Sequence, residues 1–126
     1  MILNFLLVAL GGALGAIGRY GLRVALNGAA WPWGTFIANV IGGLAMGLLM
    51  ATMLRGMDPK LSLFLGVGVL GGFTTFSSFS AESLTMLQAG QVSLAFGYMA
   101  ASVLCAVGAV ALGYWVGLFV IGRGAI

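Results

Sequence analysis

Four long apolar stretches dominate this chain and constrain its fold more than any other feature. They are joined by short polar connections and cover residues 2–25, 33–54, 61–87 and 92–122. A helix needs about 20 apolar residues to cross the hydrocarbon core of a bilayer. Only 6% of the 126 residues are charged, whereas a typical soluble domain has about 25%. We therefore expect an all-α membrane protein, with residues 1–126 forming a single transmembrane channel domain of four spanning helices.

Composition excludes several classes of function. The chain has no histidine and a single cysteine, Cys105, so it contains neither a Cys/His metal site nor an internal disulfide. Because Cys105 lies in an apolar run, we expect it to be a small buried residue. No pairing of a nucleophile with a base is visible, so we expect neither an enzyme nor a nucleic-acid-binding protein. The N-terminal stretch lacks a basic leader, so we do not expect a cleaved signal peptide.

The positive charges are almost balanced between the two sides of the membrane. With four spans, Arg55, Lys60 and Arg123 share one side, whereas Arg19 and Arg23 lie on the other. Three residues against two is a weak bias under the positive-inside rule. Four narrow helices also enclose no pore of their own. Together these observations predict an antiparallel, dual-topology homodimer. The alternative is a single orientation imposed by a partner subunit or by the first helix.

Glycines recur at four-residue spacing in the apolar stretches. The pairs are Gly11 and Gly15, Gly43 and Gly47, Gly68 and Gly72, and Gly113 and Gly117. In a membrane, small residues at positions i and i+4 let helix backbones approach each other closely. We therefore expect these pairs to mark the contacts between helices rather than a functional site.

The third apolar stretch is interrupted at "GGFTT", residues 71–75. Gly71 and Gly72 each weaken a helix by about 1 kcal/mol relative to alanine, and two β-branched threonines follow them. A break at membrane depth is tolerated only where it is buried in protein or lines a cavity. Its free carbonyl and N–H groups are the ends that broken membrane helices use to hold cations and anions. We predict a helix broken near Gly71–Thr75, and expect Gly71→Ala to restore a continuous helix.

Rings and hydroxyls alternate after this interruption. On a helix, Phe76, Phe79 and Ser80 share one face, and Ser78 and Glu82 form an adjacent stripe. One interpretation is structural, because serine and threonine in membrane helices often bond back to the carbonyl four residues earlier or to a neighbouring helix. The other is functional, because several polar groups beside a break and a carboxylate are typical of an ion pathway.

The available donors favour an anion. Asn39 lies in the middle of the second span and has two N–H donors, although it has an alternative role in holding helices together. The edge of a phenyl ring is positive, so Phe76 and Phe79 directed edge-on into a narrow path also favour an anion. Arg19 has two open interpretations. It either reaches the headgroups or the end of its own helix, or it gives a vestibule a positive potential.

Three segments resemble the Fluc (CrcB) family of bacterial fluoride channels. They are "GGALGAIGRY", "WPWGTFIANVIGG" and "GGFTTFSSFSAE", and the third matches a highly specific signature. The resemblance extends over nearly the whole chain. It implies a dual-topology antiparallel homodimer with two pores, embedded in the lipid of the bacterial plasma (inner) membrane. It also implies a passive, fluoride-selective channel that exports cytoplasmic fluoride, which enters as HF, and so confers fluoride resistance.

The resemblance also assigns roles to residues by position. It places Asn39, Phe76 and Phe79 in the fluoride pore, and it matches Arg19 to an arginine near the end of the first helix. The other pore residues that it implies are Ser77, Ser78, Ser80, Glu82, Tyr98 and Ser102. The backbone carbonyls of Gly71 and Thr74 match the ligands of a structural Na⁺ on the dimer axis. Ser78 stands where threonine is common and keeps the hydroxyl.

Two other functions stay open on the residues alone. A small dual-topology, proton-coupled drug exporter accounts for the length and the charge balance. Such exporters, however, resemble chains with a carboxylate in the first span, whereas Glu82 lies in the third. A non-transporting assembly subunit accounts for the glycines but not for the row of hydroxyls. Flux through liposomes distinguishes the three functions.

Overall fold

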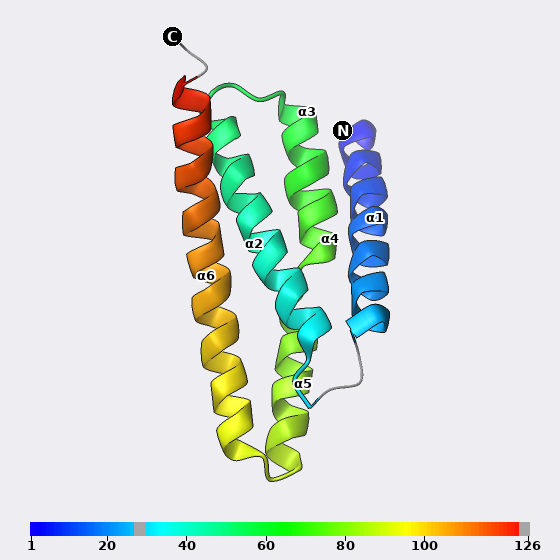
Figure 1. Cartoon of the computed structure of the whole chain (residues 1–126). Coiled ribbons are helices and arrows are strands. Elements are labelled where there is room, and N and C mark those ends of the chain that lie inside the picture. The colour runs from blue at the N-terminus through cyan, green and yellow to red at the C-terminus, as the bar shows by residue number, and fades with distance from the viewer. Residues whose placement is uncertain (27–29, 124–126) are drawn as a thin grey trace.

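The computed structural model describes residues 1–26 and 30–123, and these residues form helices joined by short connections. The elements are α1 (Ile2–Leu26), α2 (Trp33–Met53), α3 (Pro59–Ser62), η1 (Leu63–Leu70), α4 (Gly71–Phe73), α5 (Phe76–Gln88) and α6 (Val92–Arg123). Four segments are long and apolar enough to cross a membrane, and α3 to α5 together form the third of them. The start of α1, the end of α6 and the α2–α3 connection lie at the same end of the bundle (Figure 1). The prediction of four spans, with the third one broken, is confirmed.

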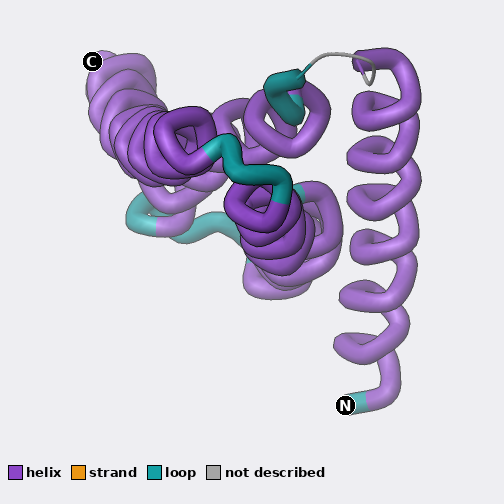
Figure 2. The backbone as a smooth tube through the Cα atoms, turned by 90° about the horizontal axis from the view of Figure 1, so that it is seen from below, coloured by secondary structure: helices purple, strands orange, loops and turns teal. Residues whose placement is uncertain are grey.

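Glycine contacts pair α1 with the first half of the third span. A Cβ atom on Gly11 would lie 2.6 Å from the Phe64 carbonyl oxygen and 2.9 Å from the Gly68 Cα. A Cβ on Gly15 would overlap the backbone of Val69. Seen from below, α1 runs across the view while α5 and α6 are seen nearly end-on, so α1 crosses the bundle obliquely (Figure 2). The predicted packing role of these glycines is confirmed.

The same kind of contact pairs α2 with α6. A Cβ on Gly43 would lie 2.9 Å from the Ala106 carbonyl oxygen, and one on Gly47 would overlap the backbone of Val110. From the opposite side, a Cβ on Gly113 would overlap the Leu44 carbonyl. The glycines of both helices therefore let the two backbones touch along their length. The bundle consists of two glycine-matched pairs, α1 with the third span and α2 with α6.

Gly47→Ala is expected to lower the stability of the bundle. The new methyl group has to push α2 away from α6, and overpacking of this kind costs about 1–3 kcal/mol. Gly108→Ala, also in α6, is the matched control, because no other atom lies within 4 Å of its added Cβ. Thermal unfolding of the purified protein in detergent measures both variants. A melting temperature for Gly47→Ala equal to that of the control would show that the contact is not tight.

The break in the third span lies later than its glycines. Gly71 and Gly72 are helical, and the chain is extended at Thr74 (φ −80°, ψ 155°) and Thr75 (φ −152°, ψ 121°). Gly72 is needed for packing, because a Cβ there would overlap the backbone of Gly12, whereas Gly71 has room for one. The expectation that Gly71→Ala restores a continuous helix is therefore wrong. Gly71 is already part of α4, and alanine there leaves the two extended threonines unchanged.

The segment before the break is a π-helix. η1 covers eight residues, more than the single turn in which this conformation is usually found. Its Gly68 lies against Gly11 of α1, so the widened helix is held by the same close glycine contact. The glycines at four-residue spacing predict a close crossing, but they do not distinguish a π-helix from an α-helix.

Large apolar side chains cover the outer surface of the helices, as a lipid environment requires. Phe5 on α1 and Leu104 on α6 are among the exposed ones. Cys105 also lies on the outer surface of α6. The prediction that Cys105 is buried is therefore wrong. An apolar run in a membrane helix includes lipid-facing positions, where a small apolar side chain is equally suitable.

Candidate functional site

Two cavities lie beside the break and the first turns of α5. The first, which we call the break cavity, has a volume of about 410 Å³. Its polar and aromatic lining residues are Asn39, Thr74, Thr75, Phe76, Phe79 and Ser102. The second, the carboxylate cavity, has a volume of about 630 Å³. Its polar lining residues are Arg23, Ser77, Ser78, Glu82, Thr85 and Gln91. The two cavities divide most of the predicted pore residues between them.

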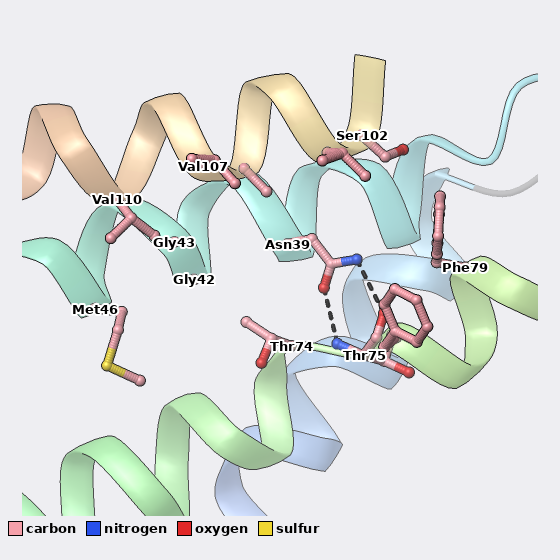
Figure 3. Close-up of a pocket in the computed structure, with 13 residues that line it drawn as sticks. Asn39, Gly42, Gly43, Met46, Thr74, Thr75, Phe79, Ser102, Val107 and Val110 are labelled. Atoms are coloured by element: carbon pink, nitrogen blue, oxygen red, sulfur yellow. Dashed lines mark hydrogen bonds between the residues drawn. The ribbon is translucent and has the colours of Figure 1, made fainter. Parts of the chain in front are cut away.

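Asn39 holds the break through both ends of its amide. Its Nδ2 donates to the Thr75 carbonyl oxygen at 3.0 Å, and its Oδ1 accepts from the Thr75 backbone N–H at 2.8 Å (Figure 3). Asn39 therefore joins α2 to the extended segment, as its predicted structural role requires. An asparagine amide has two N–H donors, and only one is used in this clamp. The second belongs to a side chain that lines the break cavity.

Thr75 caps the N-terminus of α5. Its Oγ1 accepts from the Ser78 backbone N–H at 3.2 Å, as threonine commonly does at this position. The Ser77 and Ser78 hydroxyls lie 3.3 Å and 3.2 Å from the same oxygen. Three hydroxyls therefore gather at the positive end of the α5 dipole. This end of the helix lies where the two cavities approach each other, because Thr75 lines one and both serines line the other.

Phe79 is held in a column of aromatic rings. Its centroid lies 5.3 Å from that of Phe76 and 5.5 Å from that of Tyr98. Trp31 extends the column by an edge-on contact of 5.2 Å with Tyr98. Phe79 is 8% exposed, whereas Phe76 is 76% exposed. The ring of Phe79 is therefore fixed at the wall of the break cavity, and the ring of Phe76 lies open at the surface of this single chain.

The Glu82 carboxylate accepts hydrogen bonds from two buried hydroxyl groups. Thr35 Oγ1 donates to Glu82 Oε1 at 2.7 Å, and the Tyr98 hydroxyl donates to Glu82 Oε2 at 2.8 Å. Tyr98 is fully buried and Thr35 nearly so. Both hydroxyl protons point at the carboxylate, so in this arrangement Tyr98 positions Glu82 rather than lining the break cavity. Charge-assisted bonds of this kind are stronger than bonds between neutral groups.

Several hydroxyls of α5 bond within their own helix. Ser80, Ser83 and Thr85 donate to the carbonyl oxygens four residues earlier, at 2.8–2.9 Å. The structural interpretation therefore applies to these three. Ser80 is exposed and lies outside both cavities, so the structure separates it from the other predicted pore residues. A hydroxyl that bonds back to its helix can still accept a hydrogen bond, but its proton is already donated and is not available to an anion.

Ser102 is the opposite case. It lines the break cavity and is 5% exposed, and its hydroxyl lies near that of Tyr98 but meets the geometric criteria for a hydrogen bond with no residue of 1–26 and 30–123. Buried polar groups in native proteins are almost always paired. An unpaired hydroxyl at the wall of a cavity therefore indicates a place where a ligand or water supplies the missing acceptor.

The two arginines of α1 differ in position. Arg19 Nε donates to the Gly72 carbonyl oxygen at 3.2 Å, so it caps the end of α4 rather than the end of its own helix. Arg23, one turn later, lines the carboxylate cavity together with Glu82. The vestibule role of Arg19 stays a prediction. Arg23 is the arginine that gives the lining of a cavity a positive charge.

Three residues of this site were not singled out from the sequence as site residues: Thr35, Thr75 and Arg23. Signals for them existed. Thr35 precedes Asn39 by one turn, so two polar groups share a face of a membrane helix. Thr75 comes directly before a helix, where threonine is a favoured cap. Arg23 follows Arg19 by four residues. None of these signals names the partner, because each contact joins segments far apart in the sequence.

A cation at the break would have to use backbone oxygens. No group of three or more Cys, His, Asp or Glu residues is clustered in the described chain. In an uninterrupted helix the Thr75 N–H would donate to the Gly71 carbonyl, but here it donates to Asn39. The Gly71 carbonyl is thereby released from the helical pattern. Free carbonyl oxygens at a helix break are suitable ligands for a hard cation such as Na⁺, so the residues fit the ion that the resemblance implies.

Comparison with known proteins gives a consistent result. Residues 6–114 match the family described as CrcB-like protein, Camphor Resistance (CrcB). A protein of Hyphomonas neptunium is 50% identical over 118 residues, which cover 89% of this chain and 93% of that protein. A protein of Thermus thermophilus is 45% identical over 123 residues, which cover 94% of this chain and 98% of that protein. Both are named fluoride-specific ion channel FluC.

Proposed function

The chain belongs to the CrcB family of fluoride-specific ion channels, and we propose that it exports fluoride passively along the first turns of α5. The observation that carries this pathway is the lining of the break cavity. This cavity is lined by the unpaired Ser102 hydroxyl, the Asn39 side chain with its second N–H, and the Phe79 ring. Each of these groups has a positive hydrogen or ring edge that an anion in the cavity can use.

Fluoride is the anion for which such a lining is best suited. It is small and strongly hydrated, so it needs several close donors to replace its water. The break cavity has the Ser102 hydroxyl, the spare Asn39 N–H and the Phe79 ring in its wall, and much of its remaining lining is apolar, including Val107 and Val110. We assign the selectivity to this combination of fixed donors and an apolar surround.

The carboxylate cavity is the proposed entrance. Ser77 and Ser78 line it near the N-terminus of α5, and Arg23 contributes a positive charge. Glu82 alone would repel anions, but Thr35 and Tyr98 donate to both of its oxygens and disperse its charge. Fluoride then passes from the serine hydroxyls, around the capped first turn of α5, to the break cavity. Glu82, Tyr98 and Ser80 remain proposed pore residues on the basis of the family resemblance.

The active unit in this proposal is an antiparallel dimer. Phe76, a proposed pore ring, is 76% exposed in the single chain. A second copy that covers this face would turn the exposed ring into part of an enclosed path. The Gly71 and Thr74 carbonyls of two copies would supply four oxygens to one Na⁺ on the dimer axis. Nearly balanced positive charges on the two sides of the membrane permit insertion in both orientations.

Growth in fluoride tests the function in cells. Expression of the chain in a bacterium that lacks its own fluoride exporter should restore growth in millimolar-range fluoride medium buffered at mildly acidic pH, where HF carries fluoride inward. It should give no protection against cationic dyes such as ethidium. Dye resistance without fluoride resistance would support the exporter alternative and contradict the proposal.

Both orientations should be detectable by cysteine labelling. Gln88→Cys in a Cys105→Ala background places a thiol at an exposed position at the end of α5. A membrane-impermeant maleimide should label about half of the protein in intact cells, and the remainder only after the membrane is permeabilised, since the charge bias is weak. Complete labelling, or complete protection, in intact cells would show a single orientation.

A further inference from the structure

We propose that the side-chain oxygens of Asn39 and Thr75 hold the cation site open by diverting the two backbone amides that would otherwise close it. The inference rests on the sodium part of the proposed function and assigns the positioning of the carbonyl ligands to two named side chains. Neither side chain touches the ion in this proposal. Each acts through a backbone N–H that it keeps away from a carbonyl.

The first amide is that of Thr75. In a continuous helix, the N–H of residue i+4 donates to the carbonyl of residue i, so the Thr75 amide would pair with Gly71. It donates instead to Asn39 Oδ1 at 2.8 Å. The Asn39 Nδ2 donates to the Thr75 carbonyl at 3.0 Å, so the side-chain amide binds both backbone polar groups of Thr75 (Figure 3). The Gly71 carbonyl is left to an external ligand.

The second amide is that of Ser78. By the same rule it would pair with the Thr74 carbonyl, but it donates to Thr75 Oγ1 at 3.2 Å. Local side-chain bonds of this kind compete with the helical pattern. The extended Thr74, with ψ of 155°, turns its carbonyl out of the helical direction. Both carbonyls that the family resemblance links to Na⁺ therefore lose their helical donors to side-chain oxygens.

Two neighbouring carbonyls, those of Leu70 and Gly72, have internal donors. The Gly72 oxygen accepts from Arg19 Nε at 3.2 Å, and the Leu70 oxygen accepts from the Thr74 N–H and Oγ1 at 3.0 Å and 2.8 Å. The end of α4 thus has carbonyls with internal donors next to carbonyls whose donors were removed. In this proposal the Gly71 and Thr74 oxygens are left to a cation, whereas the Leu70 and Gly72 oxygens are not.

Sodium-dependent thermal unfolding of the full chain in detergent is the test. The melting temperature is measured over a range of NaCl concentrations, with the ionic strength kept constant with N-methyl-D-glucamine chloride. A cation that binds the folded state raises the melting temperature by mass action. For the wild type we expect a saturable rise. Asn39→Leu and Thr75→Val, which remove the accepting oxygens, should raise the half-saturating sodium concentration at least about tenfold.

Two conservative variants keep the test decisive if a non-polar one fails to assemble. Thr75→Ser retains the accepting oxygen and should keep the wild-type sodium dependence. Asn39→Asp retains an oxygen for the Thr75 N–H but loses both N–H donors, including the one that binds the Thr75 carbonyl, so fluoride flux should fall while the half-saturating sodium concentration rises less than about tenfold. Ser83→Ala, whose hydroxyl donates to the Phe79 carbonyl within α5, is the control and should not change the sodium dependence.

The outcomes separate this inference from the proposed function. Asn39→Leu and Thr75→Val proteins that melt lower at every sodium concentration, with an unchanged half-saturating concentration, would overturn the inference, as would a wild type with no sodium dependence. A tenfold loss of sodium affinity in Asn39→Asp or Thr75→Ser would also contradict it. A wild type that binds sodium as expected but carries no fluoride would overturn the proposed function and leave the inference standing.

Discussion

Phe79→Ile is expected to abolish most fluoride flux while leaving the protein folded. The Phe79 ring lies between Phe76 and Tyr98 at the wall of the break cavity, so its edge is held in place. Isoleucine removes the positive edge and leaves an apolar surface, and hydrophobic constrictions tend to exclude water and ions. We expect at least about a hundredfold loss of flux, equivalent to about 2.7 kcal/mol at the barrier.

The same substitution should destabilise the protein measurably without unfolding it. Volume-conserving apolar changes usually cost less than about 1.5 kcal/mol, and the loss of ring contacts adds about 0.5–1.5 kcal/mol per aromatic pair. Phe5→Ile, at a 71% exposed position of α1, is the control and should conduct like the wild type. Fluoride efflux and a size-exclusion profile are measured for each variant. Wild-type efflux from Phe79→Ile would show that the ring only fills space.

Ser102→Ala is expected to lower fluoride flux without lowering the stability of the protein. The Ser102 hydroxyl is buried and has no partner within the described residues. Removing an unpaired buried polar group should leave the melting temperature unchanged or raise it. If the hydroxyl donates to passing fluoride, a hydrogen bond to a charged group worth about 1.5–3 kcal/mol is lost. Flux should therefore fall by at least about tenfold.

Ser83→Ala is the matched control for Ser102→Ala. Ser83 is equally buried, but its hydroxyl already donates to the Phe79 carbonyl at 2.8 Å. Its removal should change flux little. Fluoride efflux and thermal unfolding are compared for the two variants. A Ser102→Ala channel that is destabilised and conducts normally would indicate a structural hydroxyl and would contradict the assignment of the break cavity as the pathway.

The sequence was sufficient to predict the membrane class, the four spans and the helix contacts. Apolar length fixes a spanning helix almost independently of its surroundings. Close glycine contacts such as Gly47 against α6 follow equally directly, because only a missing side chain lets two backbones touch. These features depend on local composition and on a fixed spacing, so they can be predicted before any partner segment is known.

The cause of the break could not be predicted in the same way. The glycines at 71 and 72 suggested that weak helix propensity ends the helix, yet both are helical. The extended residues are Thr74 and Thr75, and Asn39 from another span holds Thr75. A tertiary hydrogen bond determines which residue leaves the helix, and propensity only shows that the region is weak.

The hydroxyls of α5 illustrate a second limit. Helical periodicity placed Ser80 beside Phe76 and Phe79, but its proton is used within the helix. Ser102, on another helix, has the unpaired hydroxyl. A serine in a membrane helix has the same identity in both situations. Only the positions of nearby acceptors decide which hydroxyl is free, and those positions come from packing.

Fluoride efflux from liposomes tests the central claim most directly. The purified protein is reconstituted into vesicles loaded with potassium fluoride and potassium chloride, and both anions are followed with selective electrodes. After valinomycin is added to carry potassium, fluoride should leave rapidly and chloride should stay inside. Without valinomycin, fluoride should also stay, because a passive channel cannot move charge without compensation. Fluoride retention with valinomycin, or equal release of fluoride and chloride, would contradict a passive fluoride-selective channel.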